Sequence, residues 1–147
     1  RVRHGEVIMQ PANKILIADD DDDFRILLKD FLSEQGFHVV EASDGGEVFD
    51  KTLAENPDIV LLDIMMPNRN GFDICRDIKK DVRTRKSVVV MLSCKSGLTD
   101  KLSSYVAGAQ RYIGKPCDLD EVKDCLKSVL RQRQISTMQF EEDQRQV

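Results

Sequence analysis

Three short runs of uninterrupted apolar residues constrain the fold of this chain more than any other feature. They are Ile15–Ala18 (ILIA), Ile59–Leu62 (IVLL) and Val88–Leu92 (VVVML). A strand with one face in water alternates apolar and polar residues, so an uninterrupted run indicates a strand that is buried on both faces. Two further short strands are predicted over residues 37–42 and 111–113.

Segments with helical periodicity separate these runs. After the first run, apolar residues recur at spacings of three and four, the pattern of a helix with one buried face: Phe24, Leu27, Leu28, Phe31 and Leu32. Further helices are predicted after the turn at 43–46 and before Asn56-Pro57, over 72–81, over 98–107 and from Leu119 to at least Val129. Strands and helices alternate five times, which predicts an α/β fold: a doubly wound, five-stranded parallel sheet with helices on both faces.

The pattern divides the chain into three parts. Residues 1–13 lack periodicity and are predicted to be an N-terminal tail, whereas residues 14–132 contain all the predicted elements and form one domain. Residues 133–147 are polar and are predicted to be either a C-terminal tail or the start of a linker helix. Only about 14 residues follow Arg133, too few for a DNA-binding domain, so we expect a stand-alone domain or one cut from a longer regulator.

Composition argues against several classes of protein. The 147-residue chain has a net charge of −4 and a pI of about 5.2, which disfavours a domain that mainly binds nucleic acid through its phosphates. No apolar run approaches the roughly 18 residues of a membrane span, and no signal peptide is visible. Four cysteines without a CxxC pair argue against structural zinc and predict reduced, mostly buried thiols in a cytoplasmic protein.

Polar residues follow four of the predicted strands. Asp19 and Asp20 follow the first, Asp63 the third, Ser93 the fourth and Lys115 the fifth. The carboxyl ends of parallel strands meet at one edge of the sheet, where ligands bind. Two carboxylates about 4 Å apart repel by roughly 4 kcal/mol at an effective dielectric of 20, so three of them need a counter-charge. Mg²⁺ fits because it prefers oxygen ligands and phosphate, and a lysine can hold a phosphoryl oxygen.

Five consecutive aspartates, residues 19–23, follow the first apolar run. The last three, residues 21–23, lie where the next helix is predicted to begin. A carboxylate there can cap free backbone N–H groups and interacts favourably with the helix dipole. We therefore assign Asp19 and Asp20 to the cation and the other three to the start of the helix.

Four motifs in order then resemble one family: ILIADDD, IVLLDIMMPNRNG, VVVMLS and GAQRYIGKP. With the spacing between them, the chain over residues 14–132 resembles the receiver domain of two-component response regulators, in the CheY-like superfamily. The resemblance implies a flavodoxin-like (βα)5 fold. It also implies a phosphorylation-dependent signalling domain rather than an enzyme that turns over an external substrate.

The resemblance assigns roles to individual residues. Asp63 is implied to be the phosphoacceptor, with Lys115 and Ser93 contacting the phosphoryl group. Mg²⁺ is implied to bind Asp20 directly, Asp19 directly or through water, Asp63, and the backbone carbonyl of Met65. Ser93 and Tyr112 match the residues that move on phosphorylation. The Lys115-Pro116 peptide bond is implied to be cis.

The resemblance also implies partners. A histidine kinase or histidine phosphotransfer protein would donate the phosphoryl group, and residues 98–130 would form the surface that an output domain or protein recognises. Direct nucleic-acid or membrane binding is not implied, and a homodimer is left open. Three positions depart from the usual pattern: Cys94 beside the switch, Gly114 before the lysine, and Arg69 in a turn.

Two other functions are compatible with some of these residues. Asp19 and Asp21 have the spacing found in Mg²⁺-dependent phosphatases of the haloacid-dehalogenase type, but no cap domain or substrate pocket is evident. The second alternative is a protein-binding module that acts without phosphate. The complete set of acceptor, cation and lysine residues argues against it.

Overall fold

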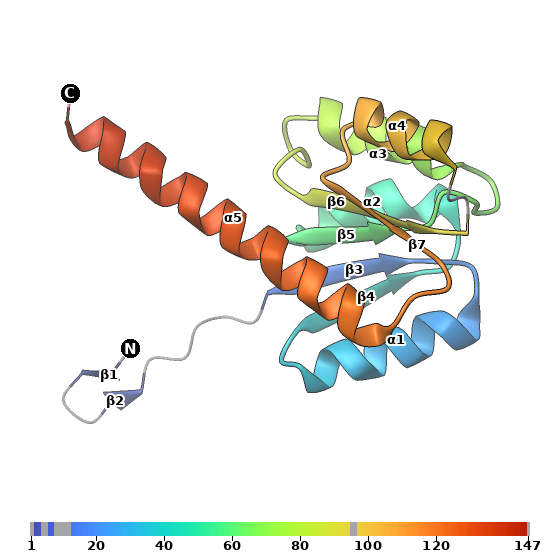
Figure 1. The fold of residues 1–147 in the computed structure, drawn as a ribbon, viewed down its shortest axis with the longest axis horizontal. Coiled ribbons are helices and arrows are strands. Elements are labelled where there is room, and N and C mark those ends of the chain that lie inside the picture. The colour runs from blue at the N-terminus through green and yellow to red at the C-terminus, as the bar shows by residue number, and fades with distance from the viewer. Residues whose placement is uncertain (1, 4–5, 8–12, 95–96, 147) are drawn as a thin grey trace.

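A five-stranded parallel sheet forms the centre of the molecule in the computed structural model, which describes residues 2–3, 6–7, 13–94 and 97–146 (Figure 1). The strand order is β4-β3-β5-β6-β7. The strands, in chain order, are β3 (Lys14–Ala18), β4 (His38–Ala42), β5 (Ile59–Leu62), β6 (Val88–Ser93) and β7 (Arg111–Gly114). The predicted doubly wound sheet is confirmed.

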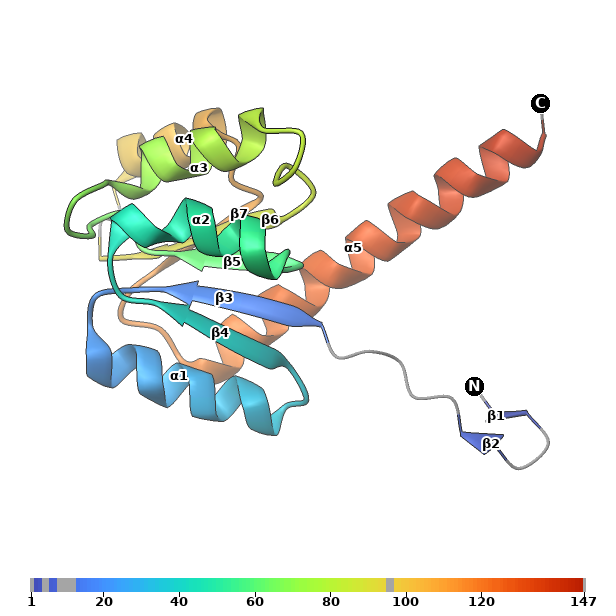
Figure 2. The same cartoon turned by 180° about the vertical axis from the view of Figure 1, so that it is seen from behind.

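Helices cover both faces of the sheet. They are α1 (Asp22–Glu34), α2 (Gly45–Glu55), α3 (Gly71–Lys80), α4 (Leu98–Ala107) and α5 (Leu119–Arg145). Helices α1 and α5 pack on one face and α2, α3 and α4 on the other, so that Figure 1 views the molecule from the side of α5 and Figure 2 from the side of α2.

Each central strand contributes to two separate cores. In β3, Ile15 and Ile17 join the core beneath α1 and α5, whereas Leu16 and Ala18 join the core beneath α2 and α3. All four residues are at most 1% exposed. Successive side chains on a strand point to opposite faces, so two apolar layers require an uninterrupted apolar run.

The start of α1 confirms the role predicted for the later aspartates. Asp21 is the N-cap, and its side chain accepts a hydrogen bond of 3.1 Å from the backbone N–H of Phe24. Asp22 and Asp23 lie in the first turn. One prediction for this helix is wrong: Leu27 is 55% exposed, because it lies at the margin of the apolar stripe while Leu28 and Leu32 occupy its centre.

Both ends of the chain add structure to what the pattern predicted. Strands β1 (Val2–Arg3) and β2 (Glu6–Val7) pair antiparallel within the predicted tail. Such a short pair depends on backbone hydrogen bonds and leaves no periodic signal. At the other end α5 continues through Arg145, since residues 133–145 contain no Gly or Pro to stop a helix. The domain boundary at residue 132 stays a prediction.

Among the described residues, none of the helices combines the length and the apolar composition needed to cross a membrane.

Candidate functional site

Three carboxylates meet where β3 and β5 end. Candidate ligand oxygens of Asp19, Asp20 and Asp63 all lie within 4.8 Å of one another. The register explains this cluster, because Ala18 pairs with Leu62 and the residues that follow them are Asp19 and Asp63. The backbone N–H of Asp63 donates to the carbonyl of Ala18 at 2.9 Å. Asp19 and Asp63 are buried, whereas Asp20 is exposed.

The site lies at the point where the strand order reverses. Strand β3 is followed along the chain by β4 on one side, while β5 lies on its other side. Ligands in open parallel sheets bind at this reversal, outside the carboxyl ends of the strands. The sequence therefore predicted the location of the cluster correctly.

Lys115 brings a positive charge to the same cluster. Its Nζ lies 2.5 Å from Asp19 Oδ2 and 3.4 Å from Asp63 Oδ2, and 4.6 Å from the centroid of the Phe24 ring. The backbone N–H of Lys115 donates to the carbonyl of Ser93 at 2.9 Å, and the Lys115-Pro116 bond is cis as predicted. These contacts hold the ammonium group over the two buried carboxylates.

Burial and neighbouring charges have opposite effects on the pKa values of Lys115 and Asp19. Burial alone would lower the pKa of Lys115, but its hydrogen bond to Asp19 and the charges of Asp19 and Asp63 raise it above the ordinary value. Burial also raises the pKa of Asp19, although Lys115 counteracts this shift. The lysine is therefore charged at neutral pH, and Asp19 depends on it for compensation.

The loop after Asp63 orients its carboxylate. Oδ1 of Asp63 accepts a hydrogen bond of 3.0 Å from the backbone N–H of Met65. Gly71 closes the loop, since its N–H donates to the carbonyl of Ile64 at 2.7 Å. A Cβ at position 71 would lie 2.7 Å from both the Asp63 carbonyl oxygen and the Ile64 Cα, so only glycine fits there. The Met65 carbonyl as a metal ligand stays a prediction.

Ser93 and Tyr112, the two predicted switch residues, lie on neighbouring strands. Ser93 ends β6 and is fully buried, and Tyr112 is half-buried in β7. The Tyr112 hydroxyl is buried without a hydrogen-bond partner among the residues that the structure describes. Burial, followed by the charges of Asp100 and Asp63, raises the pKa of Tyr112. Their movement on phosphorylation stays a prediction.

Arg25 is a residue of the site that sequence reasoning missed. Its Nη1 donates to the backbone carbonyl of Asp19 at 2.7 Å, and its Nε donates to Glu41 at 3.1 Å. Glu41 also binds Lys29 at 3.0 Å. Arg25 thus ties the segment that carries Asp19 to β4 and α1. The sequence offered one signal for this role: Arg25 is a charged residue that directly follows Phe24, the first residue of the predicted apolar face.

The departures from the family pattern are accounted for only in part. Arg69 forms an ion pair of 2.7 Å with Asp77 on α3, which gives this turn residue a partner. Cys94 is exposed, so the prediction of mostly buried thiols is wrong: Cys75 alone of the four free cysteines is buried, and Cys117 and Cys125 are half-buried. The reason is that Cys94 lies beyond the end of β6, outside both cores.

The cluster fits a magnesium ion by its chemistry. Three carboxylates supply hard oxygen ligands, and the exposed Asp20 leaves one side open to water, which Mg²⁺ retains in protein sites. Among the residues that the structure describes, no Cys or His belongs to the cluster, so its ligands are not those that zinc prefers.

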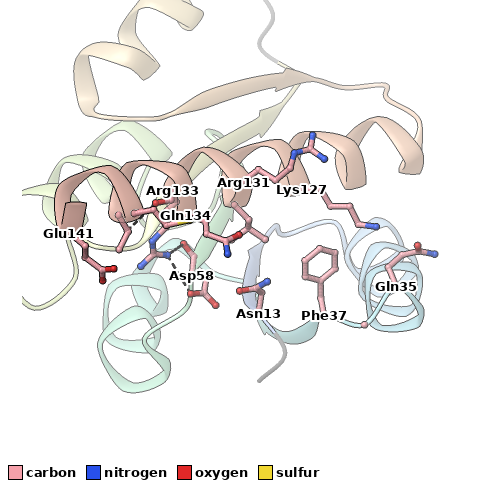
Figure 3. A pocket seen from close by; sticks show the side chains of 13 residues that line it. Asn13, Gln35, Phe37, Asp58, Lys127, Arg131, Arg133, Gln134 and Glu141 are labelled. Atoms are coloured by element: carbon pink, nitrogen blue, oxygen red, sulfur yellow. Dashed lines mark hydrogen bonds and ion pairs between the residues drawn. The ribbon is translucent and has the colours of Figure 1, made fainter. Parts of the chain in front are cut away.

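A separate groove lies at the opposite edge of the sheet. It has a volume of about 980 Å³ and runs beside α5, lined by Asn13, Phe37, Asp58 and Arg133 among others (Figure 3). Asn13 directly precedes β3, Phe37 precedes β4 and Asp58 precedes β5. The groove therefore lies at the amino ends of these strands. It is distinct from the carboxylate cluster.

The chain is similar in sequence to curated transcriptional regulators. A probable transcriptional regulator, ycf27, from Guillardia theta is 35% identical over 126 residues, which are 86% of this chain and 48% of the relative. The transcriptional regulatory protein SrrA of Staphylococcus aureus is 34% identical over 131 residues, 89% of this chain and 53% of the relative. The chain thus spans about half the length of these curated relatives.

Solved structures show the same architecture. A CheY-like response regulator receiver domain protein from Methanospirillum hungatei superposes with a TM-score of 0.81 at 26% identity, covering 86% of this chain and 99% of the other. The BeF3-activated N-terminal receiver domain of Klebsiella pneumoniae RstA gives a TM-score of 0.76 at 29% identity, covering 81% and 99%. The family model for the response regulator receiver domain matches residues 15–127. This chain therefore belongs to the family of response regulator receiver domains of two-component signalling.

Proposed function

We propose that the chain accepts a phosphoryl group on Asp63 from the phosphohistidine of a histidine kinase or a histidine phosphotransfer protein. The contact of Lys115 with both Asp19 and Asp63 carries this proposal, because it joins the acceptor, the cation ligands and a phosphate-binding lysine in one cluster. A carboxylate oxygen of Asp63 forms the new bond to phosphorus. The imidazole nitrogen leaves with the electron pair of the P–N bond.

The surrounding residues have separate tasks in this transfer. The Met65 N–H holds Oδ1 of Asp63, so the carboxylate is oriented before the donor arrives. Lys115 holds an oxygen of the transferred group, and Ser93 donates to another. Asp20, Asp63 and the Met65 carbonyl would hold Mg²⁺, with Asp19 binding it directly or through water. When bound, the ion would supply positive charge to the phosphoryl oxygens.

We propose that phosphorylation alters the surface formed by residues 98–130. Helix α4 exposes four large apolar side chains on this surface: Leu98, Leu102, Tyr105 and Val106 are 73%, 56%, 49% and 85% exposed. A group of this kind on one helix favours a protein partner. Because the curated relatives carry names of transcriptional regulators and are about twice as long, an output domain or protein is the proposed partner. A cytoplasmic location stays a prediction.

Mass spectrometry of the intact chain tests the proposal. With Mg²⁺ and acetyl phosphate, we expect a mass increase of one phosphoryl group, which disappears in Asp63→Asn. Asp30→Asn, an exposed aspartate of α1, is the matched control and should be labelled like the wild type. Continued labelling of Asp63→Asn would contradict the assignment of the acceptor.

The same assay separates the two alternatives. A phosphatase would release phosphate from a small phosphoester in many turnovers, whereas a receiver is labelled once per cycle. A module that acts without phosphate would not be labelled at all.

A further inference from the structure

The distal part of α5 extends beyond the domain. Arg133 Nη1 contacts the backbone carbonyl and the Oδ1 atom of Asp58, both at 3.3 Å, where the helix leaves the sheet (Figure 3). Residues 134–146 are all exposed, and Figure 1 shows the helix continuing past the strands. Isolated helical segments of this length are marginal in water, so an exposed segment with apolar side chains calls for a partner.

One face of α5, from the half-buried Ser128 to the exposed end of the helix, carries a regular stripe of residues. Its members recur at alternating spacings of three and four, the pattern of a helix–helix seam: Ser128, Arg131, Ile135, Met138, Glu142 and Arg145. The two apolar members are largely exposed, Ile135 by 65% and Met138 by 59%. Ile135 lies nine residues after the buried Leu126, about 180° around the helix. The middle of the stripe therefore lies on the side of α5 opposite Leu126. Its flanks still border the domain, because Arg131 and Met138 line the groove beside Phe37 and Ile135 lines a hollow beside Val88.

The order of charges along the stripe determines how two copies could meet. A basic residue, Arg131, comes first, then the two apolar residues, and then the acidic Glu142. If two such helices ran parallel, Arg131 would face Arg131 and Glu142 would face Glu142. If they ran antiparallel, Arg131 would face Glu142 of the second copy, and opposite charges attract across helix seams.

We propose that the chain forms a homodimer through α5, with the two helices antiparallel and the two-fold axis passing between Ser136 and Thr137. In this arrangement Ile135 packs against Met138 of the second copy, and each Arg131 lies beside Glu142 of the other. The paired segment, residues 128–145, is about 26 Å long at 1.5 Å per residue. Because the middle of the stripe lies on the side of α5 opposite Leu126, the two domains lie on the outer sides of the helix pair.

The inference does not depend on phosphorylation, and its test can be made without it. The paired surface is small, so we expect a weak dimer, populated at roughly 100 µM protein. Sedimentation velocity of the 147-residue chain, in EDTA and without phosphodonor, should show a concentration-dependent dimer. A monomer throughout that range would overturn the proposal whatever the outcome at Asp63.

A matched pair of substitutions identifies the face. Ile135→Ser should weaken dimerisation at least tenfold. Phe140→Ser is the control, because Phe140 is also exposed, by 64%, on the same helix but about 140° around it. Circular dichroism should show similar helix content in both variants. Loss of the dimer in Phe140→Ser with retention in Ile135→Ser would overturn the proposed face.

Charge reversal tests the antiparallel orientation. Arg131→Glu and Glu142→Arg should each weaken the dimer. Either change places two like charges beside each other at positions 131 and 142, and the two-fold symmetry repeats this repulsion in both halves of the dimer. The double variant Arg131→Glu/Glu142→Arg restores opposite charges in the antiparallel pair and should recover the wild-type dissociation constant within about threefold. In a parallel pair the double variant only exchanges one like-charge contact for another. Failure of the double variant to recover dimerisation would overturn the antiparallel arrangement.

Discussion

Lys115 Nζ lies 2.5 Å from the carboxylate of Asp19, although 96 residues separate them in sequence. The two side chains are only 12% and 2% exposed. The fold thus places the ammonium group of Lys115, which follows β7, against the carboxylate of Asp19, which follows β3. This contact leads to predictions about stability as well as phosphorylation.

Lys115→Met should destabilise the metal-free protein. It removes the positive partner of two buried carboxylates and leaves them uncompensated, which typically costs about 3 kcal/mol. Urea unfolding in EDTA measures the change in the free energy of unfolding. Lys123→Met, which loses only an ion pair with the exposed side chain of Asp120, should change it by less than about 1 kcal/mol. Equal stability of Lys115→Met and wild type would show that the lysine does not compensate the cluster.

Asp63→Asn should stabilise the metal-free protein. The Asp63 carboxylate faces two negative groups, Asp19 and Asp20, and one positive group, Lys115, so its charge is unfavourable on balance. We expect a gain of about 1 kcal/mol in the free energy of unfolding, a fraction of one close charge pair at an effective dielectric of 20. The urea midpoint in EDTA checks this, with Asp30→Asn as the control. A lower midpoint for Asp63→Asn would contradict the predicted repulsion.

Arg25→Ala should weaken magnesium binding. Arg25 donates to the Asp19 carbonyl but cannot contact the cation itself, so it acts by positioning a ligand. Groups of this kind typically contribute 10- to 100-fold to metal affinity. Isothermal titration with Mg²⁺ measures the dissociation constant. Lys29→Ala is the control, because Lys29 binds the same Glu41 without contacting Asp19, and it should bind Mg²⁺ nearly as the wild type does.

The cysteines should differ in reactivity. Cys75 is buried, its Sγ contacts the carbonyl of Ala107 at 3.4 Å, and burial raises its pKa to about 11. A raised pKa leaves little reactive thiolate at neutral pH, and the thiolate fraction grows only as the pH approaches 11. With iodoacetamide at pH 7.5, peptide mass spectrometry should find Cys94 modified first and Cys75 last. Early modification of Cys75 in the folded protein would contradict its burial.

The apolar runs predicted the sheet and the location of the site because a strand buried on both faces leaves a direct signal. Once the strands are placed, the residues after them, such as Asp19 and Asp63, must meet at one edge. Arg25 escaped prediction because its contacts with Asp19 and Glu41 depend on how α1 sits on β4. The exposure of Leu27 had the same origin, since a stripe predicts a helix face but not its margins.

The end of α5 illustrates a different limit of the sequence. A polar stretch without Gly or Pro is compatible with a tail and with a helix, and the balance depends on the turns that precede it. Val122, Leu126 and Val129 pack on the sheet, so the helix is already nucleated and later residues extend it.

The length of α5 gives small movements a long reach. Its 27 residues span about 40 Å, and only the first half packs on the sheet. A tilt of about 5° around Leu119 would therefore displace Arg145 by about 3 Å, close to the width of a hydrogen bond. A small change in the angle of the helix, too slight to disturb the packing near Leu119, therefore moves its far end by a distance that can make or break a hydrogen bond.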